Sequence, residues 1–297
     1  MPATNRTSPS PLRAAMPVAV ILAAAIIAWY ALAVALNASG AIERVLGLRD
    51  APWNWRDLVE ATLSMQRPVL PAPHQVARDI GASLLDWPLD SPRNLLFHVG
   101  ITAAATGVGF ALGALLGLLL ATLIVHSRTL DRALLPWIVA SQTVPVLAIA
   151  PIVLVILGSL GVTGLAPKAV IAMYLCFFPV TVATVQGLRS PQRSETELMR
   201  TYAATRWQEF WLLRVPSSLP FLMPSLRVAV AAGLVGAMVA ELPTGAQAGL
   251  GARLLTGSYY GNTVQIWSAL VMAALLGLAL TSAVGVLERL ALRHRGR

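Results

Sequence analysis

Long runs of apolar residues without a charged side chain recur along this sequence and determine its predicted architecture. A hydrocarbon layer about 30 Å thick is crossed by roughly 20 helical residues. Five uncharged runs reach about that length, and a sixth contains a single charged residue, Arg227. The six runs occupy residues 16–36, 99–125, 133–159, 169–188, 219–240 and 264–287. The pattern predicts an all-α integral membrane protein with six transmembrane helices.

The runs also divide the chain into segments. We expect an N-terminal tail at 1–15, an anchor helix at 16–36, an outer segment at 37–98, a five-helix core at 99–287 and a C-terminal tail at 288–297. The first run is longer than the apolar region of a signal peptide and lacks a clear small-residue cleavage site, so it is interpreted as an anchor. Trp53, Trp55, Trp87 and several prolines favour short interfacial helices in the outer segment.

Arginine is distributed unevenly over the two sides that six helices would create. The side with both termini holds 14 Arg and five acidic residues, whereas the other holds seven Arg, Lys168 and eight acidic residues. The net charges are therefore about +9 and zero. The positive-inside rule then places the N-terminus in the cytoplasm.

The composition supports the membrane interpretation. A sequence that is 57% hydrophobic and 12% charged is too apolar for the surface of a soluble domain. The formal net charge of +9 does not indicate nucleic-acid binding, because no basic cluster is interleaved with aromatic residues. The single cysteine, Cys176, lies in an apolar run and is expected to be a small buried residue.

Residues for catalysis are not apparent. A phosphate-binding loop of an ATPase ends in Gly-Lys-Ser or Gly-Lys-Thr, but the only lysine, Lys168, lies between Pro167 and Ala169. The four histidines are too scattered for a helical metal pair, and no Gly-x-Ser-x-Gly motif is present. We therefore expect no catalytic residue, no metal site and no cofactor on this chain.

The most informative segment is the polar loop at 189–218, between the fourth and fifth runs. It contains Glu197, Thr201, Ala203, Ala204, Arg206, Trp207 and Pro216. Their order and spacing resemble the coupling-loop signature of permeases of binding-protein-dependent ABC transporters. In that family a Glu-Ala-Ala triplet leads, a Gly follows six residues after the Glu, then a small residue, Arg and Trp, and a Pro closes the loop. The resemblance implies a cytoplasmic coupling helix between spans 4 and 5.

Such a helix would seat in a groove of a separate ATPase and transmit its closure to the spans. Glu197 would lie near a helix start, and Trp207 and Trp211 would share one face. Pro216 and Pro220 are expected to break the chain before the fifth span.

The loop departs from the family pattern at two places. Leu198 and Met199 replace the two alanines, so the partner groove would have to accept bulkier side chains. Ala203 replaces the glycine, at a cost of roughly 1 kcal/mol if the turn requires a left-handed backbone. A bend with ordinary helical angles is the alternative.

The resemblance covers residues from about 70 to the last span. Its features match the branch that imports nitrate, sulfonate, taurine, and pyrimidine or vitamin precursors: Leu70 to Pro73, Gln142 to Pro145, Pro151, Arg227, Ala240-Glu241 and Gly249 to Gly251. Gln142, Thr143, Pro145 and Glu241 are candidate residues of a solute path. For Gln142 and Thr143, bonding between helices is an equal alternative. Glu241 has the alternative role of capping its helix, and Arg227 that of extending to the interface.

The resemblance implies a transport subunit rather than an enzyme. Its partners would be a cytoplasmic ABC ATPase dimer that carries ATP and Mg²⁺, a periplasmic or lipid-anchored substrate-binding protein, and a second permease copy. The chain would then move a small polar organic solute into the cytoplasm by alternating access. An intramembrane enzyme and a passive channel remain the alternatives. The sequence does not identify the solute.

Overall fold

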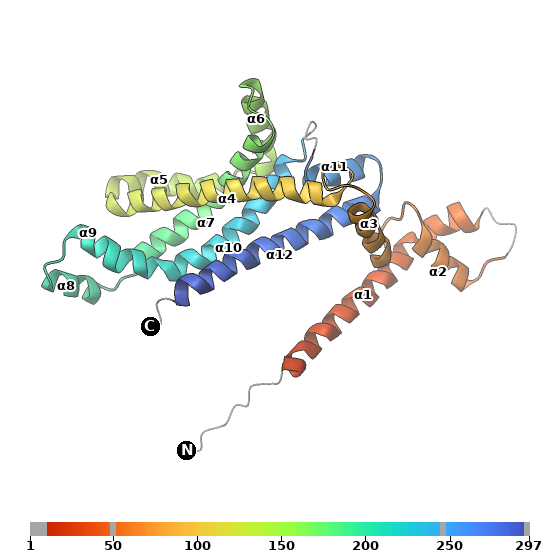
Figure 1. Ribbon diagram of the computed structural model, residues 1–297, viewed down its shortest axis with the longest axis horizontal. Coiled ribbons are helices and arrows are strands. Elements are labelled where there is room, and N and C mark those ends of the chain that lie inside the picture. Colours follow the sequence, from red (N-terminus) through yellow and green to blue (C-terminus); the bar gives the residue numbers. More distant parts are fainter. Residues whose placement is uncertain (1–10, 48–51, 244–247, 294–297) are drawn as a thin grey trace, which may run out of the picture. The chain divides into compact units, whose positions relative to one another are not determined.

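The computed structural model describes residues 11–47, 52–243 and 248–293, and every regular element in these ranges is a helix (Figure 1). Five helices are long and apolar enough to cross a membrane, or six if one bent pair counts as a single span. The prediction of an all-α membrane protein is confirmed. The expected tail at 1–15 falls mostly outside the described residues, as does the end of the tail at 288–297.

The chain forms two compact units, which are residues 1–86 with 257–268, and residues 87–256 with 269–297. The first unit contains α1 (Pro11–Ala41), the π-helical turn η1 (Ile42–Leu46), α2 (Trp55–Ser64) and α3 (Pro73–Leu85). Two further helices, α11 (Leu250–Tyr259) and α12 (Thr263–Arg293), contribute residues to both units. The helix that contains the expected anchor at 16–36 thus continues to Ala41.

Asn37, which is buried on α1, holds the extended segment that precedes α3. Its Nδ2 donates to the Leu70 carbonyl at 2.8 Å, and its Oδ1 accepts from the Val69 amide at 2.6 Å. Trp29 of the same helix donates from Nε1 to the Pro71 carbonyl at 3.0 Å. Because a proline-containing segment cannot pair all its backbone groups with itself, these side chains satisfy the groups that remain.

The second unit holds the remaining helices. They are α4 (Leu95–His126), α5 (Arg128–Ser141), α6 (Val146–Ser159), α7 (Leu165–Leu188), α8 (Arg193–Thr201), α9 (Arg206–Glu209), the π-helical turn η2 (Phe210–Arg214) and α10 (Val215–Ala240). Helices α4, α7 and α10 form its centre, with Ala105, Ala172 and Ala237 buried where the three meet. Small residues at this point allow close packing between helices that gain little from apolar burial in lipid.

Three glycines at four-residue spacing on α4 lie directly against α7. An added Cβ would lie 2.4 Å from the Ala172 Cβ at Gly109, 2.5 Å from the Cys176 Cβ at Gly113 and 2.9 Å from the Val180 Cβ at Gly117. No larger residue fits these positions without moving a backbone. The four-residue spacing of these glycines therefore gives α4 a smooth face for close contact with α7.

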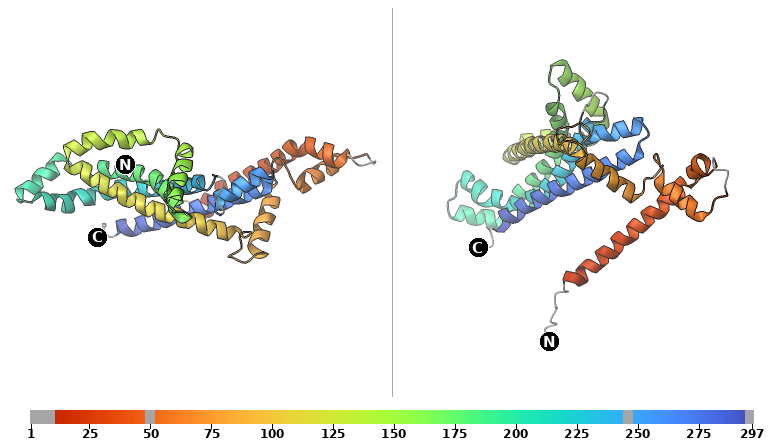
Figure 2. Two further views of the ribbon diagram at one scale, coloured as in Figure 1. Left: turned by 90° about the horizontal axis from the view of Figure 1, so that it is seen from above. Right: turned by 45° about the vertical axis from the view of Figure 1, so that its right-hand side comes forward.

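The third predicted span, residues 133–159, is not one straight helix. Helices α5 and α6 meet at an angle of 101°, with a break at residues 142–145 (Figures 1 and 2). Pro145 lacks an amide donor and restricts the residue before it to extended angles, so the α5 hydrogen-bond ladder cannot continue through it. The apolar pattern alone did not reveal this break.

Candidate functional site

The segment between α7 and α10 folds into two short helices with their own caps. The Gln192 amide, just before α8, donates to the Glu195 carboxylate at 2.8 Å. Thr205 precedes α9, and its Oγ1 accepts from the Gln208 amide at 3.3 Å while its own amide donates to the Gln208 side chain at 2.8 Å. These reciprocal caps satisfy the free donors at each helix start. The local sequence thus specifies α8 and α9 without help from lipid.

Ala203 makes the turn between the two helices with a left-handed backbone, at φ 54°. Its amide donates to the Arg200 carbonyl at 2.9 Å, and the Ala204 amide donates to the Met199 carbonyl at 3.1 Å. This pair of bonds is the Schellman motif that ends many helices. The alternative of a bend with ordinary helical angles is therefore wrong, and alanine here carries the strain that a glycine avoids.

Aromatic side chains connect α9 to the end of α4. Phe210 is buried, and its ring centroid lies 4.8 Å from that of His126. Trp207 and Trp211 lie edge to face at 5.5 Å, as their four-residue spacing predicts, and both are at least half exposed. The segment is thus anchored by Phe210 and presents two tryptophans outward.

The remaining residues of the loop signature lie along the same surface. Glu197 and Arg193 form an exposed ion pair on α8 at 3.0 Å, and the Thr201 hydroxyl donates to the Glu197 carbonyl at 3.1 Å. Arg206 opens α9. The structure therefore groups the signature residues of α8, the Ala203 turn and α9, with Pro216 beyond η2.

Pro216 does not break the chain before the fifth span, contrary to the expectation. It lies in the first turn of α10, and the helical run from Arg206 to Ala240 is continuous. The wider π-helical turn η2 just before Pro216 leaves room for the ring within this run. The break lies instead at the Ala203 turn.

A buried ion pair lies at the opposite end of α10. Glu241 is fully buried, and Lys168 of α7 donates to its Oε1 at 3.3 Å. Thr102 of α4 donates from its hydroxyl to both carboxylate oxygens, at 3.1 and 2.9 Å, and the Gly251 amide donates to Oε2 at 2.9 Å. The carboxylate is thus paired and hydrogen-bonded, as a buried charge must be.

The Gly249-Leu-Gly251 turn closes over this carboxylate. Gly249 has φ 125°, and an added Cβ would lie 2.1 Å from the Glu241 carboxyl carbon. Its amide donates to the His98 Nδ1 at 3.0 Å, and the Leu250 amide donates to the Thr102 Oγ1 at 2.9 Å. Two motifs that were separate in the sequence, Ala240-Glu241 and Gly249 to Gly251, are therefore one structural site.

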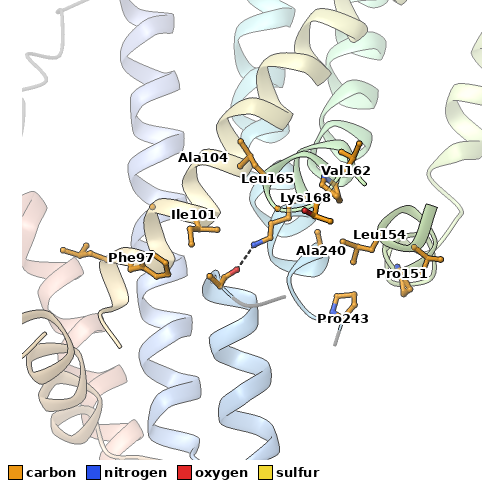
Figure 3. A pocket seen from close by; sticks show the side chains of 17 residues that line it. Phe97, Ile101, Ala104, Pro151, Leu154, Val162, Leu165, Lys168, Ala240 and Pro243 are labelled. Carbon is orange, nitrogen blue, oxygen red and sulfur yellow. Dashed lines mark hydrogen bonds between the residues drawn. The ribbon is translucent and has the colours of Figure 1, made fainter. Parts of the chain in front are cut away.

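A cavity of about 1170 Å³ lies beside Lys168, between α4, α6 and α7 (Figure 3). Its wall is apolar, with Phe97 and Ile101 from α4, Leu154 from α6 and Leu165 from α7. Lys168 is the one charged residue among the described residues of the wall, and its ammonium also donates to the Ala248 carbonyl at 2.6 Å. Apart from Lys168, the described residues of the wall carry no charge.

Comparison with known proteins identifies the chain. Residues 113–295 match the family described as the binding-protein-dependent transport system inner membrane component. This match covers more than half of the sequence and includes α8, α9 and the Glu241 site. The chain belongs to this permease family.

Named relatives agree with this assignment. The formylaminopyrimidine transport permease protein ThiX of Halalkalibacterium halodurans is 35% identical over 240 residues, which are 80% of this chain and 90% of the relative. The riboflavin transport system permease protein RibX of Chloroflexus aurantiacus is 36% identical, over 57% of this chain and 61% of the relative. The putative aliphatic sulfonates transport permease protein SsuC of Bacillus subtilis is 28% identical, over 68% and 71%. The protein is thus a multi-pass inner-membrane permease subunit of an ABC importer.

The candidate path residues of the permease fall in different places. Gln142, Thr143 and Pro145 form the exposed break between α5 and α6, outside the cavity wall. The Tyr174 hydroxyl of α7 donates to the Ser141 carbonyl and fixes α7 beside this break. Glu241 does not line the cavity either, because its side chain is enclosed by Thr102 and the glycine turn.

Arg227 has a partner that sequence reasoning missed. Its guanidinium forms an ion pair with Glu288 of α12 at 2.6 Å, so it bridges two helices instead of only extending to the interface. Lys168, Thr102 and His98 were likewise missed as neighbours of Glu241. The single lysine of a strongly apolar chain was the available signal for Lys168, because a buried cation needs a carboxylate.

Within the described residues, no group of three or more His, Cys, Asp or Glu side chains is placed to hold a metal ion. His294, one of the scattered histidines, lies outside them.

Proposed function

We propose that this permease moves a small organic solute into the cytoplasm by alternating access, driven by a separate ABC ATPase dimer that binds ATP and Mg²⁺. A periplasmic or lipid-anchored binding protein would deliver the solute, and a second permease copy would complete the path. No chemistry on the solute is assigned to this chain.

The observation that carries this proposal is the surface formed by α8 and α9. The two helices lie outside the apolar runs and, with the residues that directly follow them, present Leu198, Tyr202, Trp207 and Trp211 to solvent. Exposed aromatic side chains on a rigid polar segment favour docking to a partner protein. Because the helical run from Arg206 to Ala240 is continuous, a displacement of α9 by the partner would be transmitted directly to α10.

The charge distribution supports a cytoplasmic position for this surface. The loop at 189–218 carries five Arg and three acidic residues, and the N-terminal tail carries two Arg and no acidic residue. On the positive-inside rule both lie in the cytoplasm, where the ATPase would be.

We propose a heteroaromatic solute of the pyrimidine or vitamin-precursor class, in preference to nitrate or a sulfonate. The similarity to a formylaminopyrimidine permease over 90% of that relative's length supports this class. The apolar cavity wall supports it independently, because Lys168 is already paired with Glu241 and leaves no unpaired cation for an anion among the wall's described residues. Calorimetry on the cognate binding protein with formylaminopyrimidine, riboflavin and an aliphatic sulfonate tests the class. Binding of the sulfonate alone would contradict it.

Substitution of Glu197 by arginine tests the docking surface. Glu197→Arg places a positive charge in the interface and should lower ATP-driven uptake severely, by the equivalent of about 2 to 5 kcal/mol, at normal membrane levels. Arg193→Gln is the matched control, because it breaks the same exposed ion pair but keeps the Glu197 carboxylate. Wild-type uptake by Glu197→Arg would refute the docking role.

Reconstitution separates the importer from its alternatives. Liposomes with the permease, its ATPase and internal ATP should take up solute only when loaded binding protein is added outside. Flux without ATP at the same rate would establish a passive channel. Turnover of a solute by the purified permease alone would establish an intramembrane enzyme.

A further inference from the structure

A second cavity lies between α10 and α12, away from the Glu241 site. Its volume is about 430 Å³, and it is lined by Arg227 of α10 and by Thr281, Ser282, Gly285, Val286 and Arg289 of α12. Two arginines and two hydroxyl groups thus border one small space. Neither the coupling surface nor the apolar cavity uses any of these residues.

The local charge of this cavity is positive. Glu288 neutralises Arg227 at 2.6 Å, which leaves the charge of Arg289 on the wall. Gly285 lies under the Arg227 guanidinium, where an added Cβ would be 3.1 Å from Nη2. The Arg227 Nε is buried and has no hydrogen-bond partner within the described part of the chain. Glu288 therefore holds the Arg227 side chain on the cavity wall.

The cavity lies at the level where lipid headgroups are expected. The uncharged run of α12 ends at residue 287, and Glu288 and Arg289 follow immediately. Val286 of the cavity wall is 53% exposed, and Leu278 and Leu287 of the same helix are 65% and 63% exposed. A positive cavity at the end of an apolar helix face can contact both the anionic headgroup and the acyl chains of a phospholipid.

We propose that this cavity binds the phosphate of an anionic phospholipid. Arg289 and Arg227 donate to the phosphate oxygens, the Ser282 hydroxyl donates to the same group, and the acyl chains lie along the apolar face of α12. Arginine suits this role because its planar group makes paired hydrogen bonds to phosphate. Phosphatidylcholine would gain less, since its headgroup has no net charge and its positive choline group repels Arg289.

Native mass spectrometry of the full-length permease tests the site. Delipidated protein is titrated with phosphatidylglycerol or phosphatidylcholine, and the bound fraction is measured. We expect preferential binding of phosphatidylglycerol, weakened about fivefold by Arg289→Gln. Ser282→Glu should abolish the preference, because it places a carboxylate against the phosphate. Arg132→Gln is the matched control, since it removes an exposed arginine from α5 and should leave the preference unchanged.

Three outcomes would overturn the proposal. Equal binding of the two lipids, or equal loss in Arg289→Gln and Arg132→Gln, would show that the cavity does not select the headgroup. Displacement of bound phosphatidylglycerol by low millimolar inorganic phosphate would assign the site to a free anion. Complete disulfide crosslinking of Ser282→Cys between two copies, in a Cys176→Ser background, would assign this face to a permease dimer.

Discussion

Lys168 and Glu241 form an ion pair although 73 positions separate them in the chain, and both side chains are buried. The pair joins the start of α7 to the end of α10. Loss of one partner leaves a buried charge without compensation, which costs about 3 to 5 kcal/mol. We expect Glu241→Gln and Lys168→Met each to lower the thermal midpoint and the membrane level of the permease.

The double variant, Lys168→Met with Glu241→Gln, provides the control. It should recover much of the loss, because no charge remains buried. Additive losses in the double variant would show that the ion pair is not the cause.

The left-handed turn at Ala203 predicts a stabilising substitution. Ala203→Gly removes the steric cost of φ 54° and should stabilise the end of α8 by about 1 kcal/mol. Slower hydrogen exchange at the Ala204 amide, which closes the Schellman motif, is the measurement. Ala204→Gly should give no gain, since Ala204 is not in the left-handed region. Faster exchange in Ala203→Gly would contradict the assigned strain.

The contact between α4 and α7 predicts that two glycine-to-alanine substitutions on α4 have different effects on the stability of the permease. Gly113→Ala forces a Cβ to within 2.5 Å of the Cys176 Cβ and should cost about 1 to 3 kcal/mol through helix separation. Gly107→Ala on the same helix meets nothing within 4 Å and should be neutral or stabilising. Thermal unfolding of the purified permease distinguishes them. Equal midpoints for the two variants would disprove the close contact.

The proposed orientation predicts which single cysteines can be labelled from each side. In a Cys176→Ser background, Ser39→Cys should react with a membrane-impermeant maleimide from outside, and Ser194→Cys only after the membrane is opened. Both positions are exposed in the structure, so a failure to react reflects the membrane and not burial. Cys176 itself is buried, and serine retains a donor for the Ala229 carbonyl. Labelling of both sites from one side would refute the orientation.

Much of the fold could be predicted from sequence because lipid imposes simple rules. Long apolar runs identified the membrane-spanning helices. The break between α5 and α6 was not predicted, since residues 142–145 are as uncharged as their neighbours and only Pro145 marks the change. The predicted break at Pro216 was wrong, because a proline directly after a π-helical turn is compatible with a continuing helix.

The candidate sites were predicted in part. Local order was sufficient to predict helical structure in the loop at 189–218, which the structure divides into α8 and α9. It was not sufficient at Glu241, whose partners Thr102 and Lys168 lie 139 and 73 positions away. Pairing across such distances depends on how α4, α7 and α10 pack, which one sequence does not reveal. Arg227 and Glu288, on separate helices, escaped notice for the same reason.

The glycine face of α4 has a mechanical consequence. Where Gly109, Gly113 and Gly117 touch α7, no layer of side chains lies between the two backbones that could slip or repack during a cycle of transport. The two helices must then move as one rigid unit. Spin labels placed on α4 and α7 should keep a constant separation in every transport state. Any rearrangement that lets a solute pass must then lie at other contacts, and the break between α5 and α6 at residues 142–145 interrupts the helices outside this pair.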